Sequence, residues 1–269
     1  MIAATLLLLA PKPIVISSLF GQPAATVQKT LGKIMHRSPG TVDGSPTTTV
    51  THERGTVTYL NERAYRIGID FPNSPKMTAD DALRACGYDP RGVLSTTKDA
   101  LSYSDVWVQH WTLYGGSLPD RYRGLFTRRW TDTKTEEQSL WIEGPRSVAL
   151  APNAATRTAI LDGIRPAFMR AHKGQKLKFL VDEIATLSGW AMVVVDPIAQ
   201  SGDRLDVARS DFAKEERRVL LNRFSYALLK KNGATWKPVE IDFYDVDDTW
   251  KTWSTKHSFP KVILPDTRL

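Results

Sequence analysis

One segment of the sequence combines side chains that could form a ligand surface. Between residues 121 and 130, arginines are interleaved with aromatic rings, and the candidate binding residues are Arg121, Arg123, Arg128, Arg129 and Trp130. Guanidinium groups bind phosphate or carboxylate in forked pairs, and bases or sugars stack on exposed rings. A plain strand with its aromatic side chains inward and its arginines in water produces the same pattern, and alternation alone favours that second interpretation.

Acidic and histidine side chains do not form a metal-site pattern. The densest acidic cluster, residues 242–248, lacks the glycine turn and the closing glutamate of a calcium loop. We interpret it as helix capping by Asp247 or Asp248 together with solvated charge at a strand end. Zinc-ligand spacing is missing among the five histidines, which are His36, His52, His110, His172 and His257. The sequence therefore predicts neither a metal nor a cofactor.

No catalytic nucleophile is indicated. The single cysteine, Cys86, follows Ala82 and Leu83 in a predicted helix and is expected to be a small core residue, because a reactive thiol needs a basic or histidine partner. The Gly-x-Ser-x-Gly, phosphate-loop, dinucleotide and Cys-x-x-Cys patterns are all missing. The catalytic residues are thus unknown, although carboxylates scattered in sequence can converge in a fold.

The composition is that of an ordinary soluble globular protein. The chain has 269 residues, of which 42% are hydrophobic, so it is long enough for one large domain or two small ones. A net charge of +7 arises from 36 Lys and Arg against 29 Asp and Glu, spread along the sequence. This charge permits an anionic partner without requiring one, and a nucleic-acid partner is not expected.

Residues 1–12 resemble an export signal. Their apolar run is much too short for a membrane-spanning helix, which needs about 20 residues. It resembles the hydrophobic part of a secretory signal, although no positive charge precedes Lys12, and a start assigned too far downstream would explain that. The alternative is an N-terminal strand or a segment that docks on the core. We expect a periplasmic or secreted protein with no transmembrane helix in the mature chain.

Two domains of the α+β class are predicted, residues 13–148 and 156–269, each with helices packed on a mainly antiparallel sheet. In the first domain, residues 36–48 are rich in Ser, Pro, Gly and Thr and predict a loop. Its predicted helices are residues 23–31 and a capped segment, 78–86. Its predicted strands are 49–60, 64–71 and three more between 106 and 141.

The second domain centres on a β-hairpin at residues 224–245, whose Asn232-Gly233 pair readily takes the positive φ angles of a tight turn. A helix over 156–172 should kink or break at Pro166. Strands are predicted at residues 176–187 and 190–195, the latter with both faces covered. We also predict a terminal helix, capped by aspartate, that docks its tryptophans on the sheet.

The second half resembles a recurring C-terminal domain of uncharacterised exported bacterial proteins. The resemblance spans about residues 156–264 and rests on mostly structural residues in the segments 174–181, 189–191, 226–237, 245–250 and 259–260. It implies a periplasmic or secreted location and transfers no catalytic residue. The first half resembles, more weakly, small bacterial lipoprotein α/β modules, but it lacks a lipobox cysteine, so lipid anchoring is not predicted.

These features lead to three hypotheses about function. The first is a non-catalytic exported module that binds an unknown protein or small ligand, because export-like features occur without a site motif. The second is a hydrolase with a carboxylate or histidine site in the C-terminal domain. The third is a basic surface that binds an anionic polymer.

The second domain is expected to be cystatin-like or NTF2-like in outline, with a helix wrapped by a curved sheet.

Overall fold

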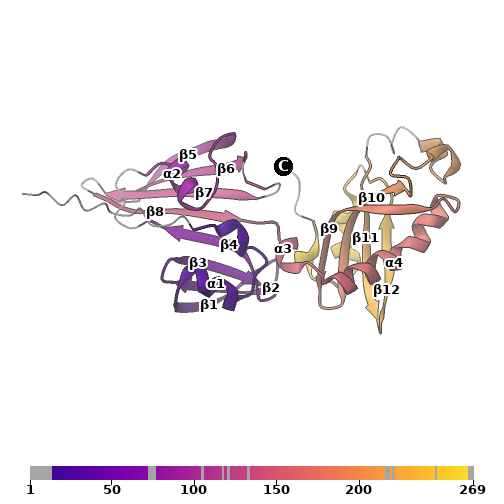
Figure 1. Cartoon of the computed structure of the whole chain (residues 1–269), viewed down its shortest axis with the longest axis horizontal. Coiled ribbons are helices and arrows are strands. Elements are labelled where there is room, and N and C mark those ends of the chain that lie inside the picture. Colours follow the sequence, from indigo (N-terminus) through magenta and orange to yellow (C-terminus); the bar gives the residue numbers. More distant parts are fainter. Residues whose placement is uncertain are drawn as a thin grey trace, which may run out of the picture. The chain divides into compact units, whose positions relative to one another are not determined.

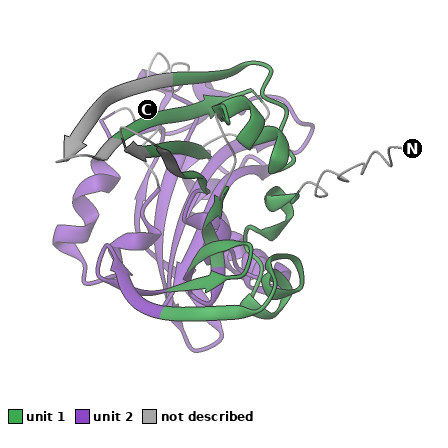
Figure 2. Cartoon of the chain, turned by 90° about the vertical axis from the view of Figure 1, so that its left-hand side faces the viewer, with its two compact units in different colours: residues 1–37, 49–58, 64–144 green, residues 38–48, 59–63, 145–269 purple. Residues whose placement is uncertain are grey.

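The computed structural model describes residues 14–71, 77–103, 106–116, 118–119, 122–131, 134–215, 219, 222–245 and 247–265, and only the backbone in the described parts of 96–107 and 130–136. The signal-like segment 1–12 lies outside the described residues. The described residues form two compact units (Figure 2). The first unit comprises those within 1–37, 49–58 and 64–144, and the second comprises those within 38–48, 59–63 and 145–265. The fold is α+β, with two antiparallel sheets (Figure 1).

The larger sheet has eight strands in the order β1-β2-β3-β4-β8-β7-β6-β5. Strands that follow each other along the chain pair with each other, except for β4 and β5. β4 pairs with β8 instead. The strands are β1 (Ile34–Val42), β2 (Ser45–His52), β3 (Gly55–Leu60), β4 (Arg63–Asp70), β5 (Val93–Tyr103), β6 (Val106–Gly115), β7 (Arg123–Thr131) and β8 (Lys134–Glu143). The three strands expected between residues 106 and 141 are confirmed as β6, β7 and β8, whereas β5 was not predicted.

The loop predicted for residues 36–48 is wrong, because this segment forms most of the β1–β2 hairpin. Its turn is Asp43-Gly44, with φ angles of 46° and 76°. Asp-Gly is a favoured pair for a two-residue hairpin turn, and β1 is an edge strand, where Pro39 is tolerated because no ladder bond needs its missing N–H. The strand predicted over 49–60 likewise divides into β2 and β3.

One face of the larger sheet is covered. Side chains on β4, β7 and β8 alternate between its two faces, and those on the covered side are at most 3% exposed: Ile67, Ile69, Phe126, Leu140 and Ile142. Helix α2 packs against β8. Alternation in the sequence therefore identified a real core face.

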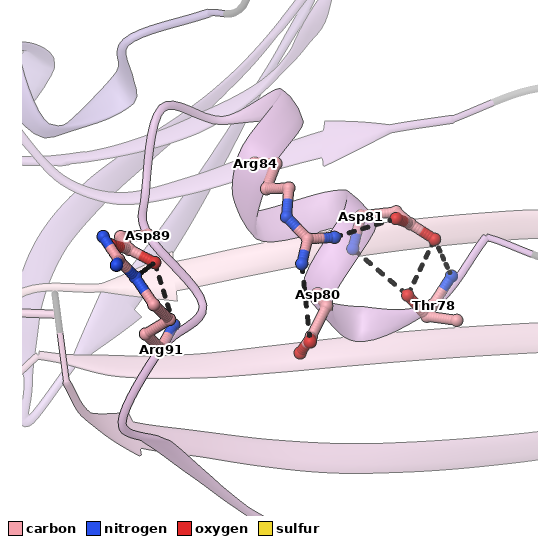
Figure 3. A network of polar contacts seen from close by, with 6 residues as sticks. All are labelled: Thr78, Asp80, Asp81, Arg84, Asp89 and Arg91. Carbon is pink, nitrogen blue, oxygen red and sulfur yellow. Dashed lines mark hydrogen bonds and ion pairs between the residues drawn. The ribbon is translucent and has the colours of Figure 1, made fainter.

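Both helices predicted in the first half are confirmed as α1 (Ala24–Leu31) and α2 (Ala79–Ala85). The capping box at the start of α2 is also confirmed: Asp81 N donates to Thr78 Oγ1 at 3.2 Å, and Thr78 N donates to Asp81 Oδ2 at 3.1 Å (Figure 3). These two bonds satisfy backbone donors that a helix start leaves without partners. Cys86 follows the helix and is fully buried, and burial raises the pKa of its thiol to about 12. It is a core residue, as predicted.

The smaller sheet has four strands in the order β12-β11-β10-β9. Helix α4 (Ala154–Ala171) packs on it, mainly against β12 (Figure 1). The strands are β9 (Leu177–Leu187), β10 (Trp190–Ala199), β11 (Ser225–Asn232) and β12 (Thr235–Asp242). Helix α4 continues through Pro166, so the expected break does not occur. The flanking Ile164 and Phe168 are fully buried, and this burial offsets the roughly 3 kcal/mol that an interior proline costs.

Both faces of β10 are covered, as predicted. Ala191, Val193 and Val195 belong to the apolar core that α4 shares with the sheet. The opposite face meets the C-terminal segment, where Trp250 stacks on Tyr226 with ring centroids 5.4 Å apart. Trp250 and Trp253 are at most 4% exposed, so the predicted docking of the terminal tryptophans is confirmed.

The short helices described in the second unit are α3 (Ser147–Leu150), η2 (Val207–Arg209), η3 (Ala213–Glu215), η4 (Thr249–Thr252), α6 (Trp253–Lys256) and η5 (Lys261–Ile263).

Two details of the second half differ from the predictions. The hairpin loop consists of Gly233-Ala234, since Asn232 still pairs with Thr235, and Gly233 supplies the positive φ angle (61°). A glycine in the first loop position suits a type II′ turn. Asp248 occupies the N-cap position of η4 but makes no side-chain capping bond there, and its carboxylate pairs with Lys251.

Candidate functional site

The larger sheet has a second face, which we call the Trp141 face. Residues directly opposite each other in an antiparallel pair share a face, so the strand register defines it. Its members with described side chains are Arg66, Gly68 and Asp70 on β4, Glu137, Ser139, Trp141 and Glu143 on β8, Arg123, Leu125, Thr127 and Arg129 on β7, Val108, His110, Thr112 and Tyr114 on β6, and Leu94 on β5. Tyr114 is 40% and Leu94 58% exposed, whereas Trp141 and Leu125 are half-buried.

The indole of Trp141 lies directly against the backbone of Gly68 on the neighbouring strand. A Cβ atom at Gly68 would come within 2.6 Å of the indole carbons, so this strand position requires a residue without a side chain. The guanidinium carbon of Arg66 lies 4.8 Å from the ring centroid on Trp141. Cation–π contact and close packing therefore hold the indole in one orientation at the centre of the face.

Arginines and acids are equal in number among the described side chains of the Trp141 face. The face carries the arginines Arg66, Arg123 and Arg129 and the acids Asp70, Glu137 and Glu143. Arg66 Nε lies 3.8 Å from Glu143 Oε2, and Arg129 Nη1 lies 3.4 Å from Glu137 Oε2. Partial burial, and then the charge of Glu137, raise the pKa of Asp70. Two of the three arginines, Arg66 and Arg129, thus have an acidic neighbour among the described side chains, which reduces the positive charge open to a polyanion.

The five residues predicted as a binding surface are only partly brought together. Arg123 and Arg129 are exposed on the Trp141 face, whereas Arg128 projects to the covered side, because successive strand residues alternate between faces. Arg121 and the side chain of Trp130 lie outside the described residues. The arginines of this segment therefore do not form one contiguous patch, and ligand binding by them stays a prediction.

Sequence reasoning did not find the residues at the centre of this face. Trp141 and Gly68 are directly opposite each other on β8 and β4, yet they are far apart along the chain. The one local signal was a glycine inside a strand pattern, which often marks a close approach of another group to the backbone. Without the β4–β8 pairing, a glycine in a strand does not indicate which side chain lies against it.

A second polar cluster is buried in the second unit around His172, the residue that ends α4. Its Nε2 atom lies 3.1 Å from the hydroxyl oxygen of Tyr244, and the ring of Phe212 packs against both side chains. His172 is fully buried and Tyr244 is 3% exposed. A bulky substrate therefore has no open route to the imidazole in this conformation.

Burial sets the protonation of this cluster. It lowers the pKa of His172 to about 4, with the nearby Asp211 acting in the opposite direction, and it raises the pKa of Tyr244. Burial also raises the pKa of Asp196, while Arg223, at 3.7 Å, and Arg204 oppose that shift. Perturbed pKa values of this kind occur at functional sites and also in structural networks.

The histidines do not converge on one point. His52 Nδ1 lies 3.1 Å from the carbonyl oxygen of Gly32, His110 Nδ1 lies 3.1 Å from Thr127 Oγ1, and His257 Nε2 lies 2.6 Å from Glu240 Oε2. Within the described part of the chain, no three His, Cys, Asp or Glu residues are grouped to hold a metal ion. None of the described helices is long and apolar enough to cross a membrane.

Comparison with protein-family models, with curated proteins and with solved structures gives no match for this chain. The resemblance of its second half to exported bacterial domains therefore stays a prediction made from the residues quoted for it. The Trp141 face and the His172 cluster are the two candidate sites in the described part of the chain.

Proposed function

We propose that this protein is a non-catalytic binding module whose ligand docks on the Trp141 face. The observation that carries the proposal is the contrast between the two sides of one sheet. One side buries its aliphatic side chains almost completely, while the other presents Trp141, Leu125, Tyr114 and Leu94 at partial or high exposure. Trp, Tyr and Arg side chains contribute most of the binding energy at many interfaces.

The balance of charge on this face favours a neutral or mixed-charge ligand over an anionic polymer. Binding of a polyanion requires cations that stay available to its charges, and it weakens steeply with salt because bound counterions are released. On the Trp141 face, Arg66 and Arg129 already have acidic neighbours. A protein or an uncharged small ligand fits this arrangement better.

The proposal can be tested by calorimetric titration of the protein at low and high salt. The probes are neutral oligosaccharides, unstructured peptides and heparin. We expect saturable binding of a neutral or mixed-charge probe with little salt dependence. Replacing Tyr114 by Ala should weaken that binding about tenfold. Met35→Ala is the matched control, because Met35 is 65% exposed and lies outside the Trp141 face. Heparin binding that falls steeply with salt would support the anionic-polymer alternative and count against this one.

The hydrolase alternative has less support. A catalytic site needs a pocket that admits the substrate, and His172 and Tyr244 are closed off by packing. The apolar core between α4 and the four-stranded sheet fills the face where a cleft was sought. Turnover of ester or peptidoglycan substrates by the purified protein, abolished by His172→Gln in a folded variant, would overturn the binding proposal in favour of this alternative.

We further propose that the protein is exported and that its second unit is cystatin-like or NTF2-like in outline. Residues 1–12 support export, and the order of α4 followed by the antiparallel strands β9, β10, β11 and β12 supports the outline. Cell fractionation followed by N-terminal sequencing tests export, since retention of an uncleaved protein in the cytoplasm would contradict it. An experimental structure of the second unit tests the outline.

A further inference from the structure

His172 lies where three segments of the second unit meet. It ends helix α4, it contacts the ring of Phe212 at a centroid distance of 5.6 Å, and its Nε2 is 3.1 Å from the hydroxyl of Tyr244, which follows β12. Two further hydrogen bonds reinforce the junction: the backbone Asp211 N donates to Ala171 O at 2.8 Å, and the backbone Tyr244 N donates to the side-chain Ser225 Oγ at 3.2 Å. One imidazole thus joins a helix end, a connecting segment and a strand end.

The surroundings of this imidazole are mostly aromatic. Phe212 contacts Phe243 and Tyr244 at centroid distances of 5.3 Å each, and Phe168 contacts Phe243 at 4.8 Å. The titratable and charged groups near the cluster include Lys173 and Asp211, which pair with each other, Asp196 and Arg223, which also pair, Tyr244, and the buried Asp245 that follows it. Among the described residues, Nδ1 of His172 is buried without a hydrogen-bond partner. The carboxylate of Asp211 acts on the imidazole through its charge, and none of the described carboxylates forms a hydrogen bond or ion pair with it.

We propose that His172 is an acid-sensitive latch, whose neutral imidazole holds residues 210–212 and 243–245 against the end of α4 and whose protonation releases them. In the neutral form one ring nitrogen can accept the hydroxyl proton of Tyr244. In the charged form both nitrogens are donors: Nε2–H can then only donate to the Tyr244 hydroxyl oxygen, Nδ1–H has no acceptor among the described residues, and an uncompensated charge is buried. The latch goes beyond ligand binding, because it concerns a different unit from the Trp141 face.

The direction and range of the effect follow from the protonation equilibrium. Burial lowers the pKa of His172 to about 4, whereas an exposed imidazole titrates near 6.5. The opened state therefore takes up a proton before the closed state does, and opening becomes more favourable as the pH falls from 6.5 to 4. Relative to its value well above pH 6.5, where it is independent of this group, the opening equilibrium constant should rise about 150-fold by pH 4 and approach about 300-fold only below that pH.

Hydrogen exchange with mass spectrometry, corrected for the intrinsic pH dependence of exchange, measures this opening on the full chain. We expect peptides covering residues 168–176, 208–214 and 240–245 to lose protection as the pH falls from 7 to 4.5, while α2 and the middle of α4 keep theirs. His172→Gln, which cannot titrate, should remove the pH dependence from those peptides. His52→Gln is the matched control, because His52 is a buried histidine of the other unit, and it should leave the response unchanged.

Two outcomes would overturn the latch. The first is a response that persists in His172→Gln and disappears in Asp196→Asn, since that result would assign the titration to the buried carboxyl. The second needs no variant and remains informative if His172→Gln fails to fold. Imidazole resonances of the wild-type protein followed by NMR should show His172 titrating below pH 5, and a folded-state pKa near 6.5 would contradict the proposal. Neither outcome bears on binding at the Trp141 face.

Discussion

The two sheets differ in whether one or both of their faces are buried. In the four-stranded sheet, α4 covers one face of β10 and the C-terminal segment meets the other. His172 and Tyr244, which both contact Phe212, are buried in the same unit. The eight-stranded sheet buries one face and leaves Trp141 on the other half-buried. An antiparallel sheet can tolerate water on one side. The enclosed sheet is therefore suited to burial-shifted protonation, whereas the half-covered sheet carries the face on which we propose that a ligand docks.

The largest expected effect tests whether the smaller sheet is closed. Phe168 is fully buried and contacts Phe179 and Phe243 at centroid distances of 5.1 and 4.8 Å. Phe168→Ala should lower the free energy of unfolding by about 3–5 kcal/mol in urea titrations, because it removes a large buried ring and leaves a cavity. Leu94→Ala, at a 58% exposed position of the Trp141 face, should cost less than about 0.5 kcal/mol. Equal losses would remove the distinction between the sheets.

Acid should destabilise the closed unit through His172. Its pKa is lowered by burial to about 4, so stability is intact above pH 6.5 and is lost as the pH falls towards 4, where the unfolded chain already holds the extra proton. The loss attributable to this group should approach about 3 kcal/mol. Denaturant unfolding at pH 7 and pH 4.5 should show a smaller difference for His172→Gln than for the wild type. An unchanged difference would mean that other groups control acid stability.

The glycine beneath Trp141 tests the packing of the half-covered sheet. Gly68→Ala should destabilise the protein by about 1–3 kcal/mol, because its new Cβ would meet the indole at 2.6 Å. Combining it with Trp141→Ala should cost less than the sum of the two single changes, since the clash disappears with the indole. Ser139→Ala, a half-buried position of the same face, is the control. Additive effects in the thermal unfolding of the double variant would contradict the contact.

The smallest effect concerns the surface charges. Arg129 and Glu137 form a largely exposed pair at 3.4 Å, and pairs of this kind contribute about 0.2–1 kcal/mol or less. Arg129→Ala should therefore change the midpoint of thermal unfolding very little, and it should not alter retention on a heparin column. A clear loss of retention would show that this arginine is available to polyanions in spite of its acidic neighbour.

Local chemistry predicted the local elements well. The Thr78–Asp81 capping box, the helix after Pro23 and the burial of Cys86 all follow from residues within a few positions of each other. The segment at 36–48 was predicted incorrectly because its serine, proline and glycine content outweighed the Asp43-Gly44 turn signal. Pairing of β1 with β2 then decided its conformation, since ladder hydrogen bonds offset weak strand propensity.

The candidate site depended on long-range pairing. Alternation along residues 121–130 indicated a strand with one arginine-bearing face, but it could not show that Arg129 would lie near Glu137 or that Arg128 would project to the covered side. The acidic neighbours of Arg66 and Arg129 on the Trp141 face count against the third hypothesis, an anionic polymer, and favour a neutral or mixed-charge partner. These pairs arise from β4, β7 and β8 lying side by side, which no short segment encodes.

The order of residues was sufficient to establish an α+β chain with a capped helix α2, a closing β11–β12 hairpin and a strand, β10, that is apolar on both faces. Each of these depends on neighbours in sequence, through capping, turn geometry or periodicity. Tertiary packing decided that Trp141 lies on Gly68 and that His172 is enclosed beside Tyr244, because side chains distant in sequence meet only when the strands pair and the helix docks. The features proposed for function belong to this second group.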